Sequence, residues 1–183
     1  MLELRRKLFH MGSLLVLVIP ILYFPFWLNF ILFFSGIILN LLLTLKNEKV
    51  YNFFRPFIDL FEREENLKRP GIQAFYALLG IFISYLLFGT KAAYGIVVLA
   101  VGDGFSGLVG YYFGKRKLFY NRKKTLEGSI AFFLSSFFAL LLITDVYKAF
   151  LISLVSAFIE SLKLPFDDNL LIPIVASLLG SAV

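Results

Sequence analysis

Residues 92–113 read AAYGIVVLAVGDGFSGLVGYYF, an apolar run with a single carboxylate, Asp103, about halfway along it. The run is long enough to cross the hydrocarbon core of a bilayer, which takes about 20 apolar residues in a helix. An ionisable group at membrane depth costs roughly 2.5–3.5 kcal/mol on insertion scales, so it is retained where it faces protein, water or a cation. The run predicts a membrane-spanning helix, and Asp103 is its first candidate functional residue.

The whole chain has the composition of a polytopic membrane protein. Of its 183 residues, 60% are apolar and only 16% are charged, whereas soluble domains average roughly 45–50% and about 25%. It has no cysteine and one histidine, His10, which excludes a thiol nucleophile, a disulfide and a multi-histidine metal site. The net charge of +6 lies in a few loops, so it predicts membrane topology and no nucleic-acid partner.

The apolar runs predict an all-α bundle of about seven membrane spans in a single domain, residues 1–183. The stretch 9–45 is long enough for two spans, with Pro20 and Pro25 at the bend. Five further spans are predicted at residues 72–88, 92–113, 126–143, 147–162 and 170–182. The last two are short, and we expect one of them to be tilted or partly re-entrant.

The distribution of basic residues predicts the orientation of the bundle. With the N-terminus in the cytoplasm, 16 of the 18 lysines and arginines fall in inside segments, and only Lys91 and Lys148 fall outside. The alternative, six spans with a buried hairpin, misplaces one of the later loops. We therefore expect a multi-pass integral membrane protein, and we expect Asp145 and Lys148, on the outer side, to be dispensable.

Residues 46–69 form the longest polar stretch, yet apolar residues recur in it with a helical period. The residues at i, i+3, i+4 and i+7 spacing give it one aromatic face: Val50, Phe53, Phe54, Phe57 and Phe61. This pattern predicts an amphipathic helix on the membrane surface, started or kinked by Pro56. A substrate gate is the alternative interpretation.

Glycines are dense around Asp103, and small residues recur there at every fourth position. The repeat consists of Gly102, Ser106, Gly110 and Gly114. Small residues at this spacing let membrane helices approach closely, which explains Gly110 and Gly114 without a ligand. It does not explain Asp103, whose flanking glycines also suit a broken helix with freed backbone groups. We interpret Asp103 as a metal-binding carboxylate beside the Ser106 hydroxyl, with a hydrogen-bonded structural aspartate as the alternative.

A basic segment follows this run and leads into the next span. It holds Lys115, Arg116, Lys117, Arg122, Lys123 and Lys124, which membrane topology or a patch for anionic lipid also explains. Lys124, Glu127 and Ser129 surround a predicted helix start, and a helix N-terminus beside lysines binds phosphate. Glu127 is equally well an ordinary acid in the first turn of a helix. Taken with Asp103, the segment favours a magnesium nucleotide, although the chain has no P-loop of the G-x-x-x-x-G-K-[ST] type.

Other polar residues also gather at the predicted cytoplasmic ends of the spans. They are His10, Glu127, Glu160, Asp167, Asp168 and Asn169. Because these ends meet on one side of the membrane, we expect the residues to converge on one pocket that faces the cytoplasm.

Four elements of the chain together resemble the dolichol kinase and phytol kinase family of membrane enzymes. They are Arg6-Lys7-x-x-His10; Gly102-Asp103-x-x-Ser106-x-x-x-Gly110-x-x-x-Gly114-Lys115; Lys124-Thr125-Leu126-Glu127-Gly128-Ser129; and Glu160 followed by Asp168-Asn169-x-x-x-Pro173. The resemblance covers residues 5–173. The related CDP-diacylglycerol synthases carry a Pro-Gly-His-Gly-Gly and Asp-Arg-x-Asp signature near the C-terminus, which this chain lacks.

This resemblance implies a Mg²⁺-dependent kinase that transfers the terminal phosphate of a nucleoside triphosphate, with CTP favoured, to a lipid alcohol. Asp103, with Glu160 or Asp168, would hold the metal, and His10, Glu127 or Glu160 would accept the proton of the hydroxyl. The residues implied to contact the nucleotide are Lys7, Gly102, Ser106, Lys115, Lys123, Lys124, Gly128, Ser129 and Asn169.

The lipid acceptor and the competing functions stay open at the level of sequence. The resemblance implies an isoprenoid alcohol such as dolichol, polyprenol, phytol or geranylgeraniol, which enters from the surrounding membrane lipids. A cytidylyltransferase that makes a CDP-lipid and a diacylglycerol kinase are the enzymatic alternatives. A small ion-coupled transporter, with Asp103 as its cation or proton site, is the alternative that is not an enzyme. A homodimer is left open as the assembly.

Overall fold

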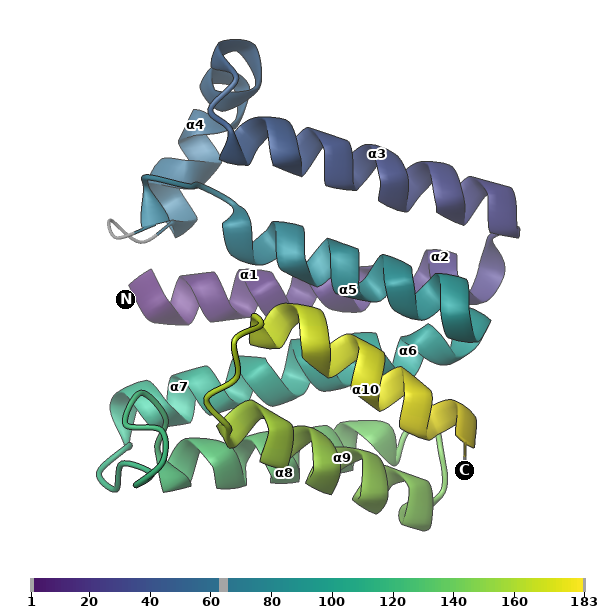
Figure 1. The fold of residues 1–183 in the computed structure, drawn as a ribbon, viewed down its shortest axis with the longest axis vertical. Coiled ribbons are helices and arrows are strands. Elements are labelled where there is room, and N and C mark those ends of the chain that lie inside the picture. Colours follow the sequence, from purple (N-terminus) through teal and green to yellow (C-terminus); the bar gives the residue numbers. More distant parts are fainter. Residues whose placement is uncertain (1, 63–65, 183) are drawn as a thin grey trace.

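The computed structural model describes residues 2–62 and 66–182, and within these ranges the chain is a helical bundle with no β-strand (Figure 1). The helices are α1 (Leu2–Val16), α2 (Val18–Tyr23), α3 (Phe26–Thr44), α4 (Glu48–Phe61), α5 (Ile72–Phe88), α6 (Ala92–Val97), α7 (Gly104–Tyr112), α8 (Leu126–Leu140), α9 (Val146–Ser161) and α10 (Asp168–Ala182). A 3₁₀ turn, η2 (Gly89–Lys91), precedes α6, and a π-helical segment, η3 (Val98–Asp103), joins α6 to α7. The predicted all-α class is confirmed.

Three helical stretches in the described parts of the chain are long and apolar enough to cross a membrane: Leu2–Tyr23, Phe26–Thr44 and Ile72–Tyr112. The third folds back on itself at Gly89, whose φ of 57° favours glycine, so α5 and the α6–α7 helix run in opposite directions (Figure 1). α8 and α10 are apolar but shorter. The composition and these stretches indicate a membrane protein, while the count of seven spans and the orientation stay predictions.

Most predicted boundaries lie within a few residues of the observed ones, and the exception matters for the site. The first predicted span begins at residue 9, but α1 begins at Leu2. Arg6 and Lys7 are therefore helical residues that face the bundle rather than a flanking charged tail. Pro25 precedes the first turn of α3, as the predicted bend requires, whereas Pro56 lies inside α4 rather than at its start.

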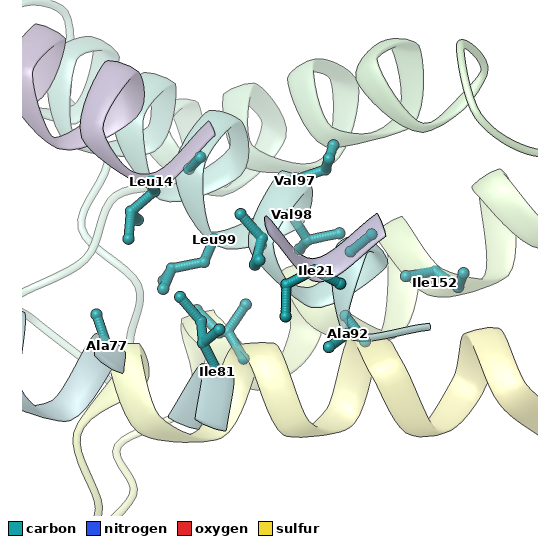
Figure 2. Packing of buried hydrophobic residues seen from close by; sticks show 14 of the residues in the cluster. Leu14, Ile21, Ala77, Ile81, Ala92, Val97, Val98, Leu99 and Ile152 are labelled. Atoms are coloured by element: carbon teal, nitrogen blue, oxygen red, sulfur yellow. The ribbon is translucent and has the colours of Figure 1, made fainter. Parts of the chain in front are cut away.

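The apolar core surrounds α6 and η3, which form the central helix of the bundle. Val98 and Leu99 of η3 are fully buried, and they pack in one cluster with Ile81 of α5 and Ile152 of α9 (Figure 2). A helix that is apolar on every side is buried on every side. The core thus fixes the segment that ends at Asp103.

The glycines beside Asp103 do not break this helix. The chain stays helical through Asp103 by adopting wider π-helical turns, so the prediction of a broken helix is wrong. The glycines instead make room for neighbouring helices: a Cβ at Gly102 would lie 2.9 Å from the Phe132 ring, and one at Gly104 would collide with Met11 of α1. π-Helical turns often occur at functional sites, and this one ends at the candidate residue.

Candidate functional site

A polar cavity of about 410 Å³ opens beside Asp103. It lies where α1, α7, α8, α9 and α10 meet the loop that precedes α8. The cavity brings together most of the predicted site residues: Lys7, Asp103, Ser106, Lys123, Lys124, Gly128, Ser129, Glu160, Asp168 and Asn169. The structure thus gathers residues that lie far apart in the sequence.

Asp103 forms an ion pair with Lys7 of α1. The Lys7 Nζ lies 2.6 Å from the Asp103 Oδ2 and also donates to the Asp103 backbone carbonyl at 3.1 Å. Lys7 is buried, and Gly107 makes its position possible, because a Cβ at residue 107 would collide with the Lys7 Cε. Since both charges are removed from bulk water, each depends on the other for its stability.

His10 lies near the same carboxylate oxygen as Lys7. Its Nε2 is 3.4 Å from the Asp103 Oδ2, and it has no hydrogen-bond partner among the described residues. His10 is one helical turn beyond Lys7, so both side chains project from the same face of α1. The two residues therefore both approach Asp103 from α1.

A second cation, Lys124, joins two acids that come from different helices. Its Nζ lies 2.6 Å from the Oε1 of Glu160 in α9 and 2.7 Å from the Oδ2 of Asp168 in α10. Burial opposes the charge, but the two carboxylates outweigh it and raise the pKa of Lys124 above its usual value. Lys124 is consequently a cation throughout the physiological pH range.

Glu160 is the most deeply buried acid of the cavity, with only 1% of its side chain exposed. Its Oε1 accepts hydrogen bonds from Lys124 and, at 3.0 Å, from the Ser106 hydroxyl of α7. Its Oε2 is buried with no hydrogen-bond partner in the part of the chain that the structure describes. A buried carboxylate oxygen without a donor is costly, so this atom is suited to a ligand or a cation.

The loop before α8 is held by hydrogen bonds on both sides of Lys124, which fixes this residue. Thr125 caps α8, since its Oγ1 accepts from the Gly128 backbone N–H at 3.1 Å. The Asn121 side chain donates to the carbonyls of Ser161 and Leu162 at the end of α9. Lys124 is therefore held over the cavity by capping interactions on two helices.

Four predicted site residues do not line this cavity. Glu127 is half-buried in the first turn of α8, where its carboxylate accepts from the Arg116 backbone N–H of the preceding loop. Lys115 is exposed to solvent, and Gly102 is buried against Phe132. His10 faces a neighbouring hollow instead.

That neighbouring hollow is an apolar groove of about 520 Å³ between α1, α3, α4 and α5. Its walls are mainly aliphatic and aromatic, and they include Phe9, Leu14, Leu39, Phe57 and Leu78. The groove shares four residues with the polar cavity: Arg6, Lys7, Gln73 and Asp103. The two hollows therefore meet at Asp103.

Sequence reasoning missed two of the four shared residues as site residues. The Arg6 Nη1 donates to the Gln73 Oε1 of α5 at 3.0 Å, while its Nη2 pairs with Glu3 at 2.9 Å. This contact joins α1 to α5 at the junction of the hollows. A signal was present in the sequence, because Gln73 is the single amide in the otherwise largely apolar run 72–88.

Comparison with known proteins agrees with the motifs. The chain is 39% identical over 124 residues to an uncharacterized protein of Methanocaldococcus jannaschii, 33% over 137 residues to a probable phytol kinase of Zea mays and 31% over 138 residues to a farnesol kinase of Arabidopsis thaliana. The matches cover 66%, 64% and 65% of this chain and 62%, 44% and 44% of those proteins. The chain is a relative of the phytol and farnesol kinases. No family model and no solved structure matches it.

The predicted likeness to the phytol kinase family is thus confirmed by relatives at about 30% identity, and the chain spans about half of the length of these plant relatives. The link to CDP-diacylglycerol synthases stays a prediction. The names of the plant proteins describe kinases of a prenol alcohol, phytol or farnesol.

The acids of the polar cavity fit a hard cation that binds together with a ligand. Asp103, Glu160 and Asp168 supply the carboxylate oxygens that Mg²⁺ prefers. Within residues 2–62 and 66–182, however, no group of three or more acidic, histidine or cysteine side chains is placed to hold a metal ion alone. Mg²⁺ characteristically binds one or two carboxylates together with substrate phosphates and water. The residues therefore fit a metal that arrives with a nucleotide.

Proposed function

We propose that the chain is a membrane-embedded kinase that transfers the terminal phosphate of a nucleoside triphosphate to an isoprenoid alcohol. The observation that carries this proposal is the meeting of a charged cavity and an apolar groove at Asp103. One substrate of such a reaction is a polyanion, and the other is an apolar chain that ends in a hydroxyl. The names of the plant relatives support the same pair of substrates.

The cavity would bind the nucleotide through its phosphates. Lys7, Lys123 and Lys124 line it. During phosphoryl transfer, lysines neutralise the negative charge on the phosphate oxygens. Asp103, with Glu160 or Asp168, would hold Mg²⁺, which supplies further charge neutralisation when bound. CTP is the donor that we expect from the family resemblance.

The reaction itself requires one bond to form and one to break. The alcohol oxygen attacks the terminal phosphorus, and the bond from this phosphorus to the bridging oxygen breaks, so that a nucleoside diphosphate leaves. His10 is the base that the geometry favours, because it lines the groove and its Nε2 lacks a hydrogen-bond partner in the described chain. Positioning and charge neutralisation supply most of the acceleration.

The test uses purified protein in lipid nanodiscs. CTP, ATP, GTP and UTP, each labelled at the terminal phosphate, are offered with farnesol, geranylgeraniol, phytol, a polyprenol or diacylglycerol, and the lipid products are identified by mass. We expect a prenyl monophosphate and a nucleoside diphosphate. A CDP-lipid with pyrophosphate would indicate a cytidylyltransferase, and label in diacylglycerol alone would indicate a different lipid kinase. No label in any lipid would contradict the proposal.

We further propose that the chain crosses the membrane about seven times, with its N-terminus and the polar cavity on the cytoplasmic side. The N-terminus, α4 and the loop before α8 lie at one end of the bundle (Figure 1), and the basic residues concentrate there. Because the chain has no cysteine, single cysteines report cleanly. In inverted vesicles, an impermeant maleimide should label Phe119→Cys and spare Lys148→Cys, and the reverse pattern would overturn the orientation.

A further inference from the structure

The apolar groove has one polar end and one apolar end. Arg6, Gln73 and Asp103 stand at the polar end, where the groove joins the cavity. Leu17, directly after α1, Gly36 of α3 and Leu78 of α5 line the opposite end. A hollow that is mostly apolar, with a few polar groups converging at one end, is the usual form of a site for an amphipathic small molecule.

The depth of the groove follows from helix geometry. His10 of α1 and Leu17, which directly follows α1, both line it, and their separation of seven residues corresponds to roughly 10 Å at about 1.5 Å per residue. The chain of α3 runs opposite to α1 (Figure 1), so Leu43, Leu39 and Gly36 lie progressively deeper along the same hollow. The groove therefore extends away from Asp103 along the long axis of the helices.

Gly36 leaves space in the wall at the deep end. A Cβ built on Gly36 would have only the Leu78 Cδ1 within 4 Å, at 3.8 Å, which is an ordinary van der Waals contact. The packing of the bundle therefore does not require glycine there. By contrast, Gly80 and Gly95 lie against the backbone of α10 and admit no side chain. What Gly36 provides is open volume in the groove.

We propose that this groove binds the hydrocarbon chain of the acceptor, with the hydroxyl at Asp103 and the tail toward Gly36, and that Gly36 sets the longest chain that fits. The inference rests on the proposed function, which it makes more specific. The occupant follows from continuity: the shared residues join the groove directly to the cavity that would bind the phosphates. A single groove also suits one prenyl chain better than the two acyl chains of diacylglycerol.

The first experiment compares acceptor lengths. The assay compares the wild-type protein with its Gly36→Ala and Gly36→Leu variants in nanodiscs, with geraniol, farnesol or geranylgeraniol as acceptor at saturating nucleotide. We expect Gly36→Leu to lower kcat/KM at least tenfold for geranylgeraniol and less than twofold for geraniol. The losses in Gly36→Ala should be smaller, and the KM of the nucleotide should not change in either variant.

The matched control is Gly12→Leu, because Gly12 is exposed on α1 and lies outside the groove, with no atom within 4 Å of its Cβ position. We expect it to behave as the wild type. An equal loss for every acceptor, or no loss, would overturn the role of Gly36.

The second experiment measures occupancy without catalysis. A geranylgeraniol analogue with a diazirine at its tail is cross-linked to the protein in the absence of nucleotide, and the labelled peptides are identified. We expect label on α3 or α5 near Gly36 and Leu78, a loss of at least fivefold in Gly36→Leu and no loss in Gly12→Leu. If these positions are labelled but the protein phosphorylates no alcohol, the groove binds a prenyl chain and the proposed kinase activity is wrong. If the protein phosphorylates the alcohol but the tail is cross-linked elsewhere, the kinase activity stands and the proposed role of the groove is wrong.

Discussion

The polar cavity and the apolar groove share a wall, yet they are built by opposite means. In the cavity, buried charges are paired with charges from another segment of the chain, as in the pairs of Lys7 with Asp103 and of Lys124 with Glu160. In the groove, hydrophobic residues of α1, α3, α4 and α5 leave a space that none of them fills. One hollow depends on a few specific contacts, and the other depends on the spacing of whole helices.

This difference teaches where a substitution is expected to act. A change in the cavity alters charge neutralisation and should affect the nucleotide and the rate of transfer. A change in the groove alters shape and should affect the alcohol alone. A change at Asp103, which belongs to both hollows, should affect transfer most.

Asp103→Asn should have the largest effect. Asparagine keeps the size of the side chain and its ability to form hydrogen bonds, but it removes the charge that pairs with Lys7. We expect turnover to fall by several orders of magnitude while thermal unfolding shows a folded protein. Asp145→Asn is the matched control, since asparagine also caps helices well and Asp145 caps α9 far from the cavity. Near-normal turnover in Asp103→Asn would rule out a role for its charge.

Lys124→Met should affect the cavity and leave the groove intact. It leaves Glu160 without its cation, so the free energy of unfolding should fall, by less than the roughly 3–5 kcal/mol seen when a fully buried pair is broken, and the midpoint of thermal unfolding should fall with it. We expect a fall in turnover of about 100-fold, the scale on which single electrostatic contacts act, with prenol cross-linking unchanged. Lys148→Met, at the exposed start of α9, is the control. Adding Glu160→Gln should recover stability but not turnover, and recovery of both would show that Lys124 is only structural.

Gly107→Ala tests whether the placement of Lys7, rather than its presence, matters. The new methyl group displaces the flexible end of Lys7 from Asp103 without removing a charge. We expect turnover to fall by about tenfold, which corresponds to roughly 1.4 kcal/mol of transition-state stabilisation. Gly12→Ala, which meets no neighbouring atom, should have no effect. Equal turnover in the two variants would show that the position of Lys7 is immaterial.

Phe61→Ala should have the smallest effect and should be confined to the groove. Phe61 of α4 lines the groove and stacks on Phe9 of α1, with ring centroids 4.5 Å apart. Such a pair contributes about 0.5–1.5 kcal/mol beyond its buried area, so we expect a severalfold rise in the KM of the alcohol. The KM of the nucleotide should not change, and a matching rise there would contradict the separation of the two hollows.

The sequence predicted the helices well because their boundaries have local causes. The predicted span 72–88 coincides with α5, which lies between Gly71 and Gly89, both with positive φ. The residues of the cavity were also predictable, since a polar side chain in an apolar span is unusual and needs a partner. The predicted start of the first span was wrong because its cause is not local. Arg6 and Lys7 resemble a flanking charged tail in the sequence, and only their partners on other helices, Gln73 and Asp103, show that they face the bundle.

Only the α4 wall of the groove, with Phe57, had a counterpart in the sequence, in the aromatic face predicted for residues 46–69. Leu39 and Leu78 are indistinguishable by type from residues that face lipid, and only the packing of the helices separates them. Lys115 and Glu127 show the converse, since each belongs to a motif of which several other residues line the cavity, while they themselves do not. Their predicted roles stay predictions, and the structure gives Glu127 a place in holding the loop.

The central claim is that the two substrates meet directly at Asp103, and the stereochemical course at phosphorus tests it. The donor carries a terminal thiophosphate made chiral with oxygen isotopes, and the configuration of the prenyl thiophosphate is determined. Direct in-line transfer between neighbouring hollows predicts inversion. Retention would show that the phosphoryl group first resides on the protein, and it would contradict the account.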